Sequence, residues 1–160
     1  MNKIAFLSIF LFLLILPFVA YPADEVGYAT AEIKVPYIEG IANKLVFQFV
    51  ASTTDGSIPS VTWTIPLDGF VFQSASIPDS ASRPSATLSV QILDDTHRDI
   101  FEGIMGSIPT LLPKNYAPVS IDSASVPVFV NSTLSAVPAT NYATAASFAI
   151  EILWTPYLFR

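Results

Sequence analysis

The chain has 160 residues, of which 52% are apolar and only 12% are charged. Its formal net charge is −6, from 7 basic and 13 acidic side chains, and the sequence contains no basic run. A nucleic-acid surface needs clustered Lys and Arg, so the composition argues against a nucleic-acid partner. Cys is absent, which excludes disulfide bonds, thiolate catalysis and Cys-ligated zinc.

Residues 1–23 have the layout of a segment that enters a membrane. Lys3 gives a positive start, residues 4–20 are uncharged and mostly apolar, and polarity returns at Asp24. This order is typical of a signal peptide, with cleavage after Ala23 as one option. As a helix the apolar run would span about 25 Å, so a retained membrane anchor is an alternative. A helix buried in an assembly is a third.

The remaining residues, 24–160, are enough for one domain with a substantial core and too few for two. We therefore expect two parts: a signal peptide or N-terminal membrane anchor over residues 1–23, and a folded domain over residues 24–160.

Alternation of apolar and polar residues with a period of two predicts strands through most of this domain. The expected strands cover residues 30–37, 44–52, 61–65, 70–77, 86–93, 126–130, 132–137 and 146–154. Residues 54–57 and 66–69 have turn composition, with Pro66 and Gly69 favouring a tight turn. Residues 99–105, bracketed by Gly103 and Gly106, are the one segment expected to form a short helical turn.

Seven or eight short strands with turn residues between them predict an all-β fold. We expect a single antiparallel β-sandwich, jelly-roll or immunoglobulin-like, preceded by a hydrophobic N-terminal helix. Trp63 and Trp154 fall at alternating positions, which favours the core over a ligand groove.

The one polar cluster gathers Asp94, Asp95, His97, Asp99 and Glu102. Four carboxylates and the chain's single His suggest a metal site, but the spacing is not that of a helix–loop–helix calcium loop. One His without Cys does not make the usual zinc site. We favour a polar turn in which Asp99 caps the short helix by accepting backbone N–H bonds.

The sequence carries no arrangement that indicates catalysis. His97 is the only imidazole and no Gly-x-Ser-x-Gly motif is present, although a pair of carboxylates brought together by folding stays an alternative. We expect a protein that is not an enzyme, with no catalytic, cofactor-binding or metal-binding residue and no cofactor. The triplet starting at Asn131 matches an N-glycosylation site, a match expected by chance in a chain rich in Ser and Thr.

The middle of the chain resembles small β-sandwich proteins encoded in the structural regions of tailed phages and prophages. The matching stretches are residues 77–79, a strand over residues 83–93, the Asp-rich turn of residues 94–103, and residues 130–134. The resemblance covers residues 44–154. Members of that family usually have Gly where this chain has His97, and they lack an export segment.

The resemblance implies a non-catalytic subunit of a phage or virus-like particle, such as a decoration, fibre-base or tail component. The alternative is an exported envelope or extracellular subunit, adhesin-like or pilus-like, which residues 1–23 favour. Expected partners are further copies or other structural subunits, with membrane contact through residues 4–20 and no nucleic acid. The expected location is the virion, or the cell envelope and extracellular space.

Overall fold

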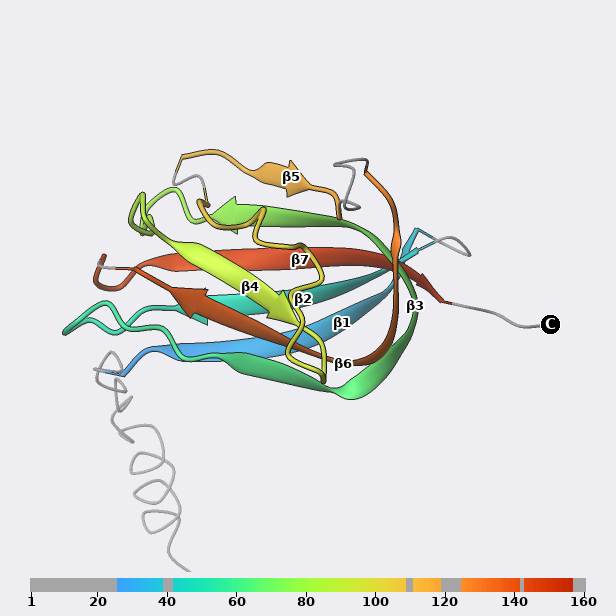
Figure 1. The fold of residues 1–160 in the computed structure, drawn as a ribbon. Helices are drawn as coiled ribbons and strands as arrows, with labels where there is room; N and C mark the ends of the chain where they lie inside the picture. Colours follow the sequence, from blue (N-terminus) through green and yellow to red (C-terminus); the bar gives the residue numbers. More distant parts are fainter. Residues whose placement is uncertain (1–25, 39–41, 109–110, 119–124, 142, 157–160) are drawn as a thin grey trace, which may run out of the picture.

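The computed structural model describes residues 26–38, 42–108, 111–118, 125–141 and 143–156 (Figure 1). These residues form an all-β domain of seven strands in one antiparallel sheet, which confirms the expected class. The strands are β1 (Tyr28–Ile38), β2 (Ala42–Val50), β3 (Val61–Pro78), β4 (Ser89–Leu93), β5 (Lys114–Tyr116), β6 (Val128–Ala139) and β7 (Ser147–Pro156). Their order is β1-β2-β7-β3-β6-β4, and β5 pairs with β3.

The segment over residues 1–23, predicted to be a signal peptide or anchor, lies outside the described residues. Among the residues that are described, no helix has the length and apolar character needed to cross a membrane.

Strand β3 organises the sheet because it takes part in three ladders, of which the short one joins Ser74–Ser76 to β5. Residues 61–71 pair with β6, and residues 69–78 pair with β7. In Figure 1 the strand runs along the lower edge, turns, and returns along the upper side of the molecule. The sheet therefore folds over on itself at β3, and one hydrophobic core lies between its two parts.

The prediction of a tight turn at residues 66–69 is wrong, since β3 continues through these residues. The register shifts between Trp63 and Leu67, so the intervening residues form an exposed bulge that includes Pro66. Gly69 has a different role: a Cβ there would clash with the carbonyl oxygen of Thr155 in β7. The glycine permits a close approach of two backbones at the bend.

The core faces predicted from alternation are confirmed. Leu88, Val90 and Ile92 are all buried around β4. The same holds for the inward residues of β2 and β7, which are Leu45, Phe47, Phe49, Phe148, Ile150, Ile152 and Trp154. Trp63 is partly buried and packs against this cluster. Both tryptophans therefore belong to the core.

Residues 99–105 do not form the predicted helix. The segment is a series of turns, in which the amides of Glu102, Ile104 and Gly106 each donate to the carbonyl three residues earlier. Glu102 has φ of 50° and Gly103 has φ of 79°. Two consecutive residues in the left-handed region interrupt a right-handed helix, so the turns cannot join into one.

These turns cover the outer edge of β4. The amides of Ile100 and Ile108 donate to the carbonyls of Ile92 and Leu88, both at 2.9 Å. Between them, the Val90 amide donates to the carbonyl of Met105 at 3.1 Å. An edge strand that is covered in this way cannot pair with another chain.

Candidate functional site

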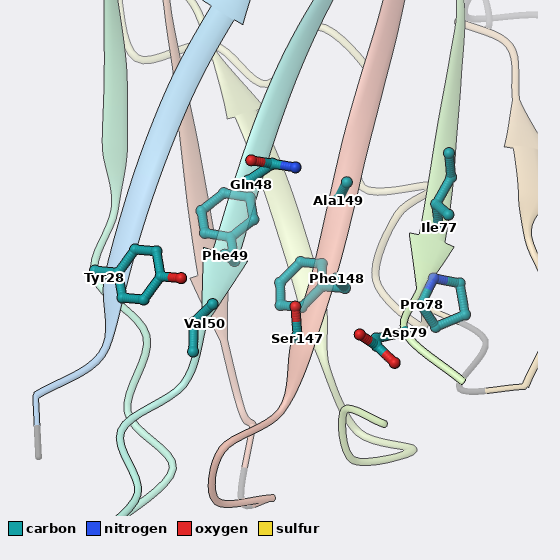
Figure 2. A pocket seen from close by; sticks show the side chains of 10 residues that line it. All are labelled: Tyr28, Gln48, Phe49, Val50, Ile77, Pro78, Asp79, Ser147, Phe148 and Ala149. Carbon is teal, nitrogen blue, oxygen red and sulfur yellow. The ribbon is translucent and has the colours of Figure 1, made fainter. Parts of the chain in front are cut away.

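A shallow groove of about 290 Å³ lies on the side of the sheet that faces away from the core, across β1, β2, β7 and the second half of β3 (Figure 2). These four strands are consecutive neighbours in the sheet. The lining residues are Tyr28, Gln48, Phe49, Val50, Ile77, Pro78, Asp79, Ser147, Phe148 and Ala149.

The register aligns the first row of the groove across all four strands. Tyr28 is opposite Val50, and Val50 is opposite Ser147. The Asp79 amide then donates to the carbonyl of Ser147 at 3.0 Å. Since neighbouring strands lie about 4.8 Å apart, the row from Tyr28 to Asp79 spans about 14 Å.

A second row lies two residues farther along each strand. Gln48 is opposite Ala149, and Ala149 is opposite Ile77. Small side chains, Ser147 and Ala149, thus follow one another on the outward face of β7. Larger side chains stand on both sides of them, so the surface is hollowed along β7 (Figure 2).

The floor is held from below by the core. Because side chains alternate along a strand, Phe148 points inward between Ser147 and Ala149. Its ring stacks on that of Phe49, with centroids 4.9 Å apart. This stacked pair fixes the neighbouring strands β2 and β7 at the centre of the groove.

Four side chains supply hydrogen-bonding groups to the groove: Tyr28, Gln48, Asp79 and Ser147. Tyr28 is 49% exposed at one end, and Asp79 is exposed at the other. Figure 2 shows the carboxylate of Asp79 directed toward Ser147. One of its oxygens accepts the amides of Ala81 and Ser82 at 2.7 and 3.3 Å. Gln48 lies in the second row.

This set of groups can donate and accept hydrogen bonds. The lining contains no His, Lys or Arg, and Asp79 is its one charged residue. Nucleophilic catalysis would need a base beside the Ser147 hydroxyl. Paired-carboxylate hydrolysis would need a second acid next to Asp79.

The acidic cluster around residue 94 lies elsewhere, in the turn after β4. One oxygen of Asp94 accepts the amides of Thr96 and Arg98, both at 3.0 Å, and the Thr96 hydroxyl at 2.6 Å. Its other oxygen pairs with Arg98 Nε at 3.2 Å. Partial burial raises the pKa of Asp94, but these hydrogen bonds outweigh burial, and the pKa is below its usual value.

Asp99 accepts backbone N–H bonds in the way expected of a cap. Its two oxygens accept the amides of Phe101 at 3.0 Å and Gly103 at 2.9 Å. The turns of residues 99–105 thus begin on this carboxylate. Within the described part of the chain, no three His, Asp or Glu residues are placed to share a metal ion.

His97 is exposed and adopts φ of 62°, in the left-handed region. Its amide donates to the carbonyl of Asp94 at 3.0 Å, which closes the turn. The residue therefore stands at a backbone position that favours glycine.

The remaining sequence candidates do not meet the groove. Asn131 of the glycosylation triplet is exposed on β6, while Ser132 beside it is buried. The groove residues themselves were not found from the sequence. The only local signal was the small outward pair Ser147 and Ala149, and a hollow there depends on neighbours from β1, β2 and β3.

Comparisons with known proteins add little to this description. No protein-family model matches the chain, and no curated protein matches it. One solved structure that is similar is titled "Cyanophage Pam1 capsid asymmetric unit". The identity is 14%, the TM-score is 0.39, and the alignment covers 81% of this chain and 86% of that chain. A score of this size does not establish a shared fold.

Proposed function

We propose that the chain is a non-catalytic structural subunit that acts by assembling with other protein subunits. The observation that carries the proposal is a set of large apolar side chains that the fold leaves exposed. Eight large apolar side chains are at least 36% exposed among the described residues: Val26, Tyr28, Ile65, Ile104, Leu111, Leu112, Val126 and Phe129. Large exposed apolar side chains on a chain with 12% charged residues favour burial against other subunits.

The phage or virus-like particle is the assembly that we propose for it. The resemblance of residues 44–154 to phage structural proteins supports this choice, with decoration, fibre-base and tail components as the candidate positions. The folded-over sheet supports a sandwich of jelly-roll or immunoglobulin-like type, because core side chains from the β3–β6 and β3–β7 ladders meet in one cluster.

The experiment is to purify particles from the native source and to search them for this chain by mass spectrometry. In parallel, the purified full-length chain is examined by light scattering and electron microscopy. We expect the chain in particles, at a constant ratio to the major subunit, or regular oligomers on its own. A chain that stays monomeric and never co-purifies with a particle would show the proposal to be wrong.

The alternative proposal is an exported envelope or extracellular subunit of adhesin or filament type. It is supported by residues 1–23, whose order of charged start, apolar run and small residues is that of an export segment. Fractionation of the native host, with intact mass of the chain, separates the two proposals. An envelope fraction free of particles supports the alternative, and an uncleaved cytoplasmic chain contradicts it.

A further inference from the structure

We propose that the groove over β7 binds a neutral saccharide. The inference does not depend on the structural role proposed above. It rests on which groups the groove presents, which it lacks, and how the sheet beneath it uses its backbone.

The backbone below the centre of the groove has no hydrogen bonds to offer. Strands β2 and β7 each lie between two paired neighbours, so the N–H and C=O groups beneath the centre of the groove are used within the sheet, while β1 at one end of the groove is an edge strand. A bound peptide gains much of its affinity by adding main-chain hydrogen bonds at a sheet edge. A ligand over the centre of the groove meets side chains alone, which favours a molecule recognised through its own hydroxyl groups.

The polar groups match hydroxyls. The amide of Gln48, the hydroxyl of Ser147 and the phenol of Tyr28 each donate and accept hydrogen bonds. The carboxylate of Asp79 is an acceptor, with recorded partners on one of its two oxygens. A sugar hydroxyl is both donor and acceptor, so a ring lying across Ser147 can satisfy groups on both sides of the groove.

The apolar groups match the other face of a sugar ring. The floor offers Ala149 and Val50, and the ring of Tyr28 is half exposed at the end of the row. C–H bonds of a pyranose can pack on the face of an aromatic ring, whose quadrupole makes that face negative. A cavity of about 290 Å³ lies near the lower end of the range for small-molecule sites, which suits a mono- or disaccharide.

Charge disfavours anionic ligands relative to neutral ones of this size. Asp79 is the one charged residue in the lining, so phosphate, sulfate and sugar acids would be repelled. Lys44, on the same face of β2 as Gln48, is paired with Glu151 at 2.8 Å. An amine could pair with Asp79 but would leave Gln48 and Tyr28 without partners, and it serves as a contrasting probe.

The test is isothermal titration calorimetry on the full-length chain. The neutral probes are glucose, galactose, mannose, N-acetylglucosamine, lactose, cellobiose and chitobiose. N-acetylneuraminic acid is the anionic probe, and lysine amide is the cationic probe. We expect saturable binding of at least one neutral probe, and weaker or no binding of the two charged ones.

Two pairs of variants locate the site. Tyr28→Ala should weaken binding of the neutral probe by about two- to tenfold, which corresponds to the loss of one aromatic contact. The control Phe129→Ala removes an aromatic ring that is 44% exposed on β6, outside the groove. It should leave the affinity for the neutral probe unchanged. Ala149→Leu should fill the floor and abolish binding, while Ala139→Leu, at an exposed Ala of β6, should not.

Several outcomes would overturn the inference. They are no saturable binding of any neutral probe, tighter binding of either charged probe, and binding that survives Ala149→Leu. Equal losses with Tyr28→Ala and Phe129→Ala would also contradict it, because the effect would then not belong to the groove. None of these results bears on whether the chain assembles into particles.

Discussion

Aspartate side chains build the turns of this protein by one repeated contact. In four places a carboxylate oxygen accepts the amide two residues farther along: Asp55 from Ser57, Asp79 from Ala81, Asp94 from Thr96 and Asp99 from Phe101. This contact replaces a backbone turn with a side-chain one. Four of the 13 acidic residues of the chain therefore serve loop structure.

The best connected of these carboxylates, Asp94, should make stability depend on pH in the acid range. Its pKa is lowered in the folded state, so its contribution to stability is complete above the unfolded-state pKa of about 4. The contribution disappears as the pH falls through the lowered folded-state pKa. Asp94→Asn should therefore lose stability at neutral pH and flatten the acid limb of the stability curve. Urea unfolding from about pH 7 to about pH 2.5 measures both effects.

The matched control is Asp95→Asn, at the exposed neighbouring position. It removes the same charge from the same turn but none of the contacts made by Asp94. If the stability of the two variants depended on pH in the same way, the pH dependence would come from the charge of the turn and not from the hydrogen bonds of Asp94.

The backbone angle φ at His97 determines how substitutions at this position change stability. At φ of 62° a side chain other than Gly is strained, so His97→Gly should leave the free energy of unfolding unchanged or raise it by up to about 1 kcal/mol. Urea melts of the wild type and the variant measure the difference. His97→Val, which places a β-branched residue there, should destabilise the protein. A marked loss in His97→Gly would instead assign the imidazole a role of its own.

At the scale of elements, period-two patterns predicted most strands and their core faces. The predictions from the sequence were wrong where the role of a residue depends on contact with a distant part of the chain. Pro66 and Gly69 have the composition of a local turn. Yet the reason for a glycine at position 69 is the backbone of Thr155 in β7, which leaves no room for a side chain. Strand β5 was missed because it has three residues next to Pro113, and it forms only by pairing with Ser74, Ala75 and Ser76 of β3.

The candidate groove was missed for the same reason. Its hollow exists only when three separate regions of the sequence, the β1–β2 hairpin, the end of β3 and the start of β7, align Tyr28, Val50, Ser147 and Asp79 in one row. No window of the sequence contains that row. The acidic turn, by contrast, is local, and its main feature, a carboxylate accepting nearby amides, was predictable at Asp99.

The bend of β3 gives a test at the element scale. Gly69→Ala should force the backbones of β3 and β7 apart and cost about 2 kcal/mol or more of unfolding free energy. Gly103→Ala is the comparison: it has open space around the new Cβ but φ of 79°, so it should cost only about 1 kcal/mol. Thermal or urea unfolding ranks the two. The opposite order would mean that the close approach at Gly69 does not fix the bend.

For the whole molecule, the distribution of charge determines how any assembly should respond to salt. Only 20 of 160 residues are charged, 7 basic and 13 acidic, and four of the acids hold turns. Eight large apolar side chains are exposed among the described residues and are available for contacts between subunits. Contacts of this kind gain from the hydrophobic effect, which salt does not screen.

Oligomers of the full-length chain should therefore persist when NaCl is raised from about 0.05 M to about 1 M, and repulsion between subunits of net charge −6 should decrease. Sedimentation velocity at both salt concentrations measures the change in the oligomer fraction. A mild chaotrope such as urea, below its unfolding midpoint, should dissociate the same oligomers because it weakens apolar contacts. Dissociation by salt with resistance to urea would show that ion pairs hold the subunits together. The exposed apolar side chains would then need another partner.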